Sequence, residues 1–336
     1  MRAIEWLTTS VRFIDQTKLP FEEAYITTCD YHVIGEGIRS LAIRGAPLIG
    51  VAAAYGVALS SLTAPATDYS SFKTYVQSAI NELAHSRPTA VNLFWALKRM
   101  EYVLIQSTDI SSSRQSLIEE AIAIHREDEG MCRMMGLNGN ELIPDKATIL
   151  TICNTGALAT GGEGTAQSVI TTAHRLGKQV KVYSCETRPA LQGARLTTWE
   201  LMNAGVDVTM ITDSMAATLM KRKGVDCVIT GSDRIASNGD AANKIGTYSL
   251  AILAKYHAIP FYITAPSSTI DMHIPSGEDI PIEERDPNEV LKVFGQSVTT
   301  SNVKVWNPSF DVTPAHLITA IITEKKVYRS PYSFTV

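Results

Sequence analysis

Residues 148–166, with the sequence TILTICNTGALATGGEGTA, decide the fold class of this 336-residue chain. The segment begins with apolar and β-branched residues, continues as a glycine-rich stretch, and leads into a helical pattern. This order predicts a buried strand that ends near Cys153, then a loop, then a helix. Backbone amides at the start of a helix bind anions well, so the loop favours a phosphate or carboxylate ligand.

Toward the C-terminus, short β-branched runs alternate with helical stretches. Such alternation is typical of right-handed βαβ units, which build a parallel sheet with helices on both faces. We therefore expect a doubly wound, Rossmann-like α/β domain. Its strands are expected at 148–153, 180–185, 207–211, 227–230 and 261–264, and its helices at 164–175, 191–204, 214–221 and 240–256.

The N-terminal part has a different pattern, with alternating segments that predict short strands at 3–7 and 10–14 and then helical spacing. Helices are expected at 48–62, 71–86, 91–105 and 113–135, the last ending at a turn around Gly136–Gly139. The uncharged stretch 45–64 has a strongly apolar part shorter than the roughly 20 residues of a membrane span, which predicts a buried helix. The chain is thus expected to have a small, mainly helical domain with short strands at 1–140 and the Rossmann-like domain at 141–336.

Charge and cysteine content narrow the function classes. Lys and Arg total 30 against 34 Asp and Glu, a formal net charge of −4, so nucleic acid and membrane surfaces are not expected as partners. Five widely spaced cysteines without a CxxC pair indicate neither a disulfide framework nor a zinc site. The first residues lack the apolar core of a secretory signal. These features favour a reducing, cytoplasmic setting.

The loops that follow the predicted strands supply the candidate site. Ligands of open parallel sheets bind outside the carboxyl ends of the strands, and four of the five expected strand ends carry an ionisable or thiol group. Cys153 is either a small packing residue or a functional thiol. Asp233 is either part of a structural ion pair with Arg234 or a general acid or base. Cys29, Cys132 and Cys227 are expected to be packing residues.

Further candidates are basic or amide side chains at helix starts. We expect Asp240 to cap the helix that reaches Tyr256, with Asn243 and Lys244 in its first turn, where a cation opposes the helix dipole and needs an anion. Arg44 and Arg87 each stand before a helix and would form a cationic patch if the N-terminal domain closes over the sheet edge.

Cofactor and metal signals are weak. The glycines at 162 and 164 resemble the start of a dinucleotide motif, but Gln167 stands where a third small residue belongs. The scattered histidines form no metal-binding motif, so neither a cofactor nor a metal site is expected.

The chain resembles the S-methyl-5-thioribose-1-phosphate isomerases of methionine salvage. They belong to a superfamily that also holds the regulatory subunits of the translation-initiation guanine-nucleotide-exchange factor. The stretches that carry the resemblance are IRGAPLIG (43–50), SRPTAVNL (86–93), CNTGALAT (153–160), ETRPALQGARLTTWEL (186–201), TDSMAA (212–217), GSDRIASNGDAANKIGTYSLA (231–251), IPFYITAPSSTID (259–271) and IPIEERDP (280–287).

The resemblance implies catalytic roles for Cys153 and Asp233 and a homodimer that forms through the α/β domain. The substrate contacts that it implies are Arg44, Gly45, Ala46, Arg87, Gln192, Asn243 and Lys244. Thr155 and Ser232 depart from the commoner alanines of the two catalytic motifs. The implied reaction converts an aldose 1-phosphate to its ketose. An isomerase of ribose 1,5-bisphosphate and a non-enzymatic regulatory subunit are the alternatives.

Overall fold

The computed structural model describes residues 2–65, 67–300 and 302–334. Two compact units divide the chain. Unit 1 holds residues 1–133 and 156–164, and unit 2 holds residues 134–155 and 165–336. The expected domain boundary at residues 140 and 141 stays a prediction.

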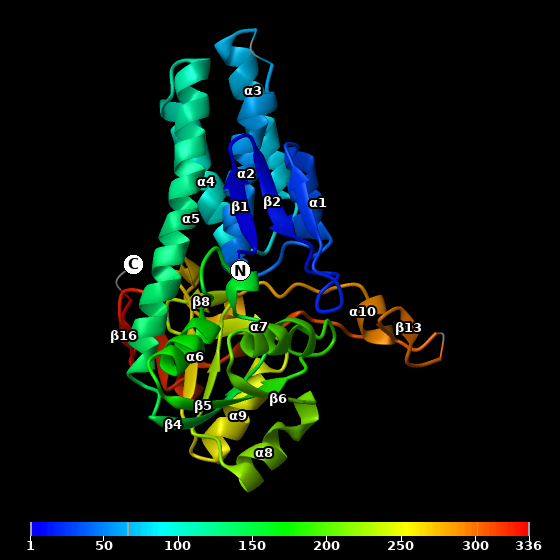
Figure 1. Ribbon diagram of the computed structural model, residues 1–336, viewed down its shortest axis with the longest axis vertical. Helices are drawn as coiled ribbons and strands as arrows, with labels where there is room; N and C mark the ends of the chain where they lie inside the picture. Colours follow the sequence, from blue (N-terminus) through cyan, green and yellow to red (C-terminus); the bar gives the residue numbers. More distant parts are fainter. Residues whose placement is uncertain (1, 66, 301, 335–336) are drawn as a thin grey trace. The chain divides into compact units, whose positions relative to one another are not determined.

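Unit 1 combines a small antiparallel sheet with a group of helices (Figure 1). The sheet has the order β1-β2-β3, and its first two strands match the sequence prediction. Its elements are β1 (Ile4–Leu7), β2 (Ser10–Ile14), β3 (Tyr25–Thr28), α1 (Tyr31–Arg39), α2 (Ala46–Thr63), α3 (Tyr69–Ala84), α4 (Val91–Gln106) and α5 (Ile110–Asn140), whose last turns belong to unit 2.

Helix α2 is the central helix of unit 1, as the uncharged stretch 45–64 predicts. It is long and apolar enough to cross a membrane by length and composition, yet 83% of its 18-residue apolar window is buried inside the fold. Apolar residues surround the whole helix, so it packs on several sides at once. Gly50 lets α4 approach closely, because a Cβ there would lie 2.8 Å from the Asn92 carbonyl oxygen.

Unit 2 is built on a seven-stranded sheet of order β16-β15-β10-β7-β4-β5-β6. Six strands run parallel and β16 pairs antiparallel at one edge. The strands are β4 (Lys146–Thr151), β5 (Gln179–Cys185), β6 (Asp207–Ile211), β7 (Cys227–Thr230), β10 (Phe261–Thr264), β15 (Ala320–Ile322) and β16 (Val327–Tyr328). The helices between them are α6 (Ala166–Arg175), α7 (Thr198–Asn203), α8 (Ala216–Lys223) and α9 (Thr247–Tyr256).

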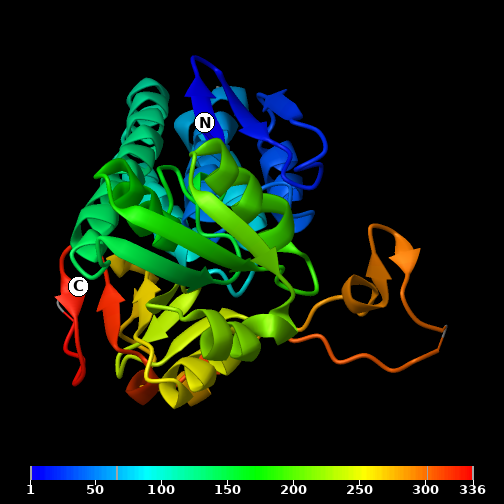
Figure 2. The same cartoon turned by 60° about the horizontal axis from the view of Figure 1, so that its bottom comes forward.

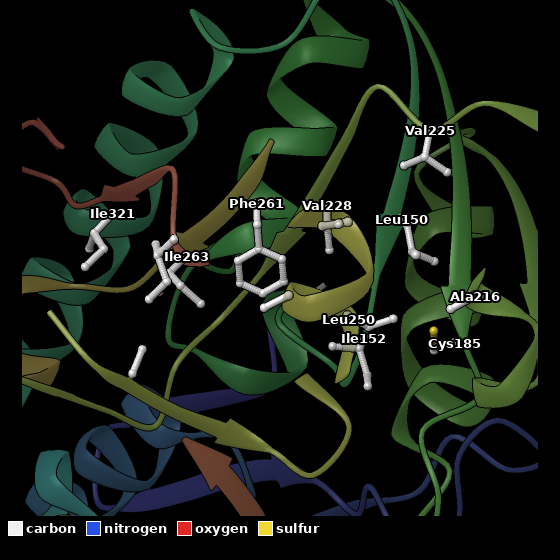
Figure 3. Packing of buried hydrophobic residues seen from close by; sticks show 14 of the residues in the cluster. Leu150, Ile152, Cys185, Ala216, Val225, Val228, Leu250, Phe261, Ile263 and Ile321 are labelled. Atoms are coloured by element: carbon white, nitrogen blue, oxygen red, sulfur yellow. The ribbon is translucent and has the colours of Figure 1, made fainter. Parts of the chain in front are cut away.

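Helices cover both faces of this sheet, which confirms the doubly wound, Rossmann-like prediction (Figure 2). Alternate residues of each strand enter different clusters: Leu150 packs with α8 and α9, whereas Ile149 packs with α6 and α7. Figure 3 shows the first cluster around Phe261, with Cys185 among its members. Strands buried on both faces are expected to be continuous apolar runs, and the central strands β7 and β10 are buried along their whole length, whereas the edge strand β6 is largely exposed.

A second sheet of order β11-β8-β9-β14 was not predicted. Its strands are β8 (Arg234–Ala236), β9 (Ala241–Lys244), β11 (Ile270–Asp271) and β14 (Phe310–Thr313). The prediction of one helix over 240–256 is therefore wrong at its start, because 241–244 pairs along its whole length with β14 and the helix begins only at Thr247. Pairing with a distant strand has overridden the local preference of an alanine-rich segment.

Three smaller predictions are also corrected. Asp240 is not a helix cap; its carboxylate accepts hydrogen bonds from the amides of Gly277 and Ala315. Helix α5 does not end near Gly136, because this glycine lies inside it, where a Cβ would come within 2.5 Å of Thr172 Oγ1 on α6. Cys29 is exposed, whereas Cys132 and Cys227 are buried as expected.

A short helix and a hairpin of unit 2 extend away from its sheets (Figures 1 and 2). They are α10 (Asn288–Leu291), β12 (Lys292–Val293) and β13 (Gln296–Ser297). Arg188, after β5, ties this extension to the sheet by donating a hydrogen bond to the Val290 carbonyl at 2.9 Å.

Candidate active site

The order of the main sheet places one pair of loops at its topological switch point. The chain runs from β4 outward through β5 and β6, and then returns to β7 on the other side of β4. Ligands of doubly wound folds bind where the strand order reverses in this way. The loop after β4 carries Cys153, and the loop after the neighbouring β7 carries Asp233. Both candidate catalytic residues thus follow the two strands that define this point.

The two loops are in direct contact. A Cβ at Gly231 would lie 2.8 Å from Thr155 Cγ2, so the backbone after β7 packs onto the side chain two residues beyond Cys153. The Asp233 amide donates to the Ala242 carbonyl at 2.9 Å, which joins this loop to strand β9. Asp233 is half-buried, and its neighbour Arg234 forms an ion pair with Asp271 at 3.4 Å.

Cys153 is buried at 7% exposure and has a left-handed backbone with φ of +69°. A residue with a side chain pays about 1–3 kcal/mol for such a conformation, which therefore needs support from its surroundings. The Cys153 amide donates to Thr187 Oγ1 at 2.9 Å, and its carbonyl accepts from Thr197 Oγ1 at 2.6 Å. An ordinary packing cysteine needs no such conformation. The backbone therefore favours the functional interpretation of this thiol.

The next residue, Asn154, is anchored by a buried carboxylate. Its amide group donates to Glu200 and, at 3.3 Å, to Thr197 Oγ1. Glu200 and Thr197 come from α7 and from the π-helical segment Gly193–Thr197 that precedes it. Wide π-helical turns are frequent at functional sites. This one brings two polar side chains under the loop that carries Cys153.

Gln192 stands immediately before that π-helical segment. Its side chain is 7% exposed, and Oε1 is buried with no hydrogen-bond partner among the residues that the structure describes. A buried amide oxygen without a partner costs about 1–3 kcal/mol, which a bound hydroxyl group can recover. Position along the sequence gave no reason to select Gln192; only the family resemblance named it.

Asn243 and Lys244 are buried on strand β9 and are not in a helical first turn, so the predicted conflict between Lys244 and a helix dipole is wrong. The Asn243 amide group donates to Thr230 Oγ1 at 2.8 Å and to Thr247 Oγ1 at 2.9 Å. Both its hydrogens are used, which leaves Oδ1 to accept from a ligand. Lys244 Nζ lies 4.7 Å from the centroid of the Phe310 ring, a cation–π distance.

Asp311 supports this segment from strand β14. Its carboxylate accepts hydrogen bonds from the amides of Gly246 at 2.7 Å and Tyr248 at 3.0 Å. Burial raises the pKa of the Asp311 carboxyl to about 6, against the lowering effect of these amides and of Lys244. The sequence gave no signal for this residue, because its partners are about 65 positions away.

Two other acidic residues, Asp213 and Glu186, follow strands β6 and β5. Asp213, after β6, accepts hydrogen bonds from the amides of Thr187 and Arg188, both at 2.8 Å. It therefore shapes the turn after β5. Burial, together with the nearby charge of Asp213, raises the pKa of the Glu186 carboxyl. A pocket of about 280 Å³ adjoins this turn and has mainly apolar walls that include Pro189, Ile245 and Trp306.

Unit 1 holds the remaining predicted site residues. Arg44 is buried and precedes Gly45, whose φ of +100° begins helix α2 at Ala46. A Cβ at Gly45 would lie 2.4 Å from Ala159 Cα, so only glycine lets the loop 156–164 lie against this helix start. Arg87 precedes α4, whose first turn contacts α2 near Gly50. The starts of α2 and α4, which Arg44 and Arg87 precede, thus lie near each other in unit 1, and a helix start favours an anion.

Within residues 2–65, 67–300 and 302–334, no three His, Cys, Asp or Glu side chains form a group that could hold a metal ion.

The fold and the switch-point loops define a class of two-unit α/β proteins, and comparison identifies it. The chain belongs to the Initiation factor 2 subunit family, whose sequence profile matches residues 42–329. Within this family it is 54% identical over 339 residues to the methylthioribose-1-phosphate isomerase of Heliobacterium modesticaldum, a match that covers 100% of this chain and 98% of the relative. The resemblance stated from the motifs is thereby confirmed.

Solved structures give the same result. The 5-methylthioribose 1-phosphate isomerase of Pyrococcus horikoshii OT3 is similar with a TM-score of 0.93 and 43% identity, covering 98% of this chain and 93% of that one. A protein of A. fulgidus described as translation initiation factor eIF-2B, subunit delta, is similar with a TM-score of 0.89 and 42% identity, covering 99% and 97%.

Proposed function

We propose that this protein converts 5-methylthioribose 1-phosphate to 5-methylthioribulose 1-phosphate, the aldose–ketose isomerisation of methionine salvage. One observation carries the proposal: Cys153 and Asp233 follow the two strands at the switch point, in a chain 54% identical to a named isomerase over its full length. We assign the reaction to the cytoplasm and to a homodimer, with neither nucleic acid nor membrane as a partner. We further propose residues 1–140 and 141–336 as its two domains.

The substrate explains why an acid and a thiolate are needed. Its anomeric carbon carries phosphate, so no free aldehyde is available and the ring must open with the phosphate attached. We assign Asp233 as the acid that protonates the ring oxygen. Cys153, as thiolate, removes the C2 proton to give an enol phosphate, and then returns that proton to C1. The C2 hydroxyl proton goes back to Asp233 as the ketone forms. General acid–base steps of this kind contribute about 10²–10⁴-fold each.

The remaining residues bind the substrate in this proposal. In unit 1, Arg44, Gly45, Ala46 and Arg87 offer guanidinium groups and helix-start amides that suit a phosphate, and in unit 2 Lys244 offers a further cation. Asn243 Oδ1 and Gln192 Oε1 accept hydrogen bonds from sugar hydroxyls. The pocket beside Ile245 has mainly apolar exposed walls, which suit the methylthio end. Arg188 also lines it, but its guanidinium already donates to the carbonyls of Pro189 and Val290, so a second phosphate would lose hydration there.

Isotope labelling separates two routes for the hydrogen. If Cys153 carries a proton, deuterium at C2 is partly lost to solvent water during turnover. Complete retention of deuterium at C1 would favour a hydride shift instead. An exchange of roles between Cys153 and Asp233 would leave the labelling result unchanged.

The similarity to the A. fulgidus protein favours a second candidate, a regulatory subunit without catalytic activity. A scaffold has no use for a strained cysteine backbone and an aspartate at the same switch point. One assay tests these functions together: the protein is incubated separately with methylthioribose 1-phosphate and ribose 1,5-bisphosphate. We expect the ketose from the first substrate only. Turnover of the bisphosphate alone, or of neither substrate, would overturn the proposal.

A further inference from the structure

Two threonine hydroxyls hold the backbone of Cys153 from opposite sides. Thr187 Oγ1 accepts the Cys153 amide at 2.9 Å, and Thr197 Oγ1 donates to the Cys153 carbonyl at 2.6 Å. Both threonines are almost completely buried, at 0% and 1% exposure. We propose that Thr187 and Thr197 are positioning residues that keep Cys153 in its left-handed conformation and so aim its thiol at the substrate. The inference rests on the catalytic role proposed for Cys153.

Thr187 connects the loops after two neighbouring strands. Its hydroxyl accepts from the Cys153 amide and donates to the Cys185 carbonyl at 3.0 Å, so it joins the loop after β4 to the end of β5. Thr187 itself has φ of +65°, and the Asp213 carboxylate holds its amide at 2.8 Å. The backbone of Cys153 is therefore held by the turn after β5, which is itself held by the Asp213 carboxylate.

Thr197 is held in a corresponding way. Its hydroxyl donates to Cys153 and accepts from Asn154, whose amide group also reaches Glu200. The π-helical segment can lie this close because residue 193 is glycine: a Cβ there would come within 2.8 Å of Thr187 Oγ1 and would clash with the Cys185 carbonyl. Gly193 therefore allows the π-helical segment that carries Thr197 to lie against the turn that carries Thr187.

In this proposal the hydroxyl groups of Thr187 and Thr197 act through hydrogen bonds and not through packing. Valine has nearly the shape of threonine, so replacing either threonine with valine removes the hydroxyl and keeps the volume. The buried amide or carbonyl of Cys153 then lacks its partner, and a left-handed residue without this support relaxes to another conformation. A displacement of about 1 Å at a catalytic group costs up to about 100-fold in rate. Substrate binding residues are untouched, so the loss is expected in kcat.

The experiment compares Thr187→Val and Thr197→Val with Thr187→Ser and Thr197→Ser. Thr198→Val is the matched control, because its hydroxyl donates to the Ala194 carbonyl, four residues earlier, at 2.6 Å. Steady-state kinetics with methylthioribose 1-phosphate give kcat and KM. Hydrogen–deuterium exchange of the peptide containing Cys153 measures how firmly its backbone is held, independently of catalysis.

We expect each valine variant to lose about 10- to 100-fold in kcat with KM changed less than about threefold. The serine variants and Thr198→Val should stay within about threefold of the native kcat. Exchange at the Cys153 amide should accelerate in Thr187→Val and stay slow in Thr187→Ser. Native kcat in both valine variants, or no rescue by serine, would overturn the inference. If Thr187→Val does not fold, the two variants at Thr197 decide.

A failure of the proposed function can be distinguished from a failure of this inference. If Cys153→Ser retains native kcat, the catalytic assignment is wrong, whereas the exchange measurement still reports whether the hydroxyls hold this backbone.

Discussion

The backbone of Gly231 packs against the side chain of Thr155, with the position of a Cβ on Gly231 only 2.8 Å from Thr155 Cγ2. Gly231 lies two residues before Asp233, and Thr155 lies two residues after Cys153. This contact fixes the spacing of the two loops that carry the proposed acid and thiolate. The close approach of the loops that carry Cys153 and Asp233 therefore favours a glycine at position 231.

Replacing Gly231 with alanine is expected to push these loops apart. We predict a loss of at least about tenfold in kcat and a fall of about 1–3 kcal/mol in the free energy of unfolding. Kinetics and urea denaturation measure the two effects. Gly130→Ala is the control, because a Cβ there meets no atom within 4 Å. On helix α5 that alanine should keep native activity and raise stability by up to about 1 kcal/mol. Native kcat in Gly231→Ala would show that the loop spacing is unimportant.

Gln192→Leu is expected to weaken substrate binding without weakening the fold. The change removes a buried oxygen that has no partner among the described residues, so stability should stay level or rise by about 1 kcal/mol. If that oxygen accepts a substrate hydroxyl, KM rises about tenfold.

Thr313→Val is the control for Gln192→Leu, because its hydroxyl is also buried without a partner in the described part of the chain, on strand β14. It should change stability in the same direction and leave KM as it is. Equal KM values for the Gln192→Leu variant and the native protein would remove Gln192 from the site.

Asp311 should make the stability of unit 2 depend on pH. Its pKa is raised from 3.8 to about 6, chiefly by burial, so the folded protein holds a proton there that the unfolded chain has already released. Stability from this group is therefore complete below about pH 4 and is lost as pH rises to about 6, by about 3 kcal/mol in total.

Urea denaturation of the native protein and Asp311→Asn between pH 4.5 and pH 7.5 measures this contribution. The stability of the native protein relative to the variant should fall across about pH 4.5–6.5 and level off above it. The variant also loses one hydrogen bond of the helix start, a pH-independent offset of about 1 kcal/mol. A constant difference across the range would mean that Asp311 is ionised throughout.

The main sheet could be predicted from the sequence because its strands are local, apolar and separated by amphipathic helices. Leu150 and Cys227 lie in runs of residues whose period and β-branching identify them without any distant partner. The rule that ligands bind beyond strand ends then selected Cys153 and Asp233 before any motif was recognised.

The second sheet and the supports of the site could not be predicted in this way. Strand β9 exists because Asn243 and Lys244 pair with residues more than 60 positions away, and its own composition resembles the start of a helix. Thr187, Thr197 and Asp311 act through hydrogen bonds between elements that are far apart in sequence. Threonine and aspartate are too common at turns to be selected individually. Such residues become visible only once the backbone path is known.

The turnover of Cys153→Ser and Asp233→Asn on methylthioribose 1-phosphate tests the central assignment most directly. Ketose phosphate formation is followed by ³¹P nuclear magnetic resonance beside the native protein, with circular dichroism to confirm that each variant is folded. The proposed acid–base mechanism predicts that kcat falls by at least about 100-fold in each variant. A folded variant at either position that forms the ketose at the native rate would contradict it.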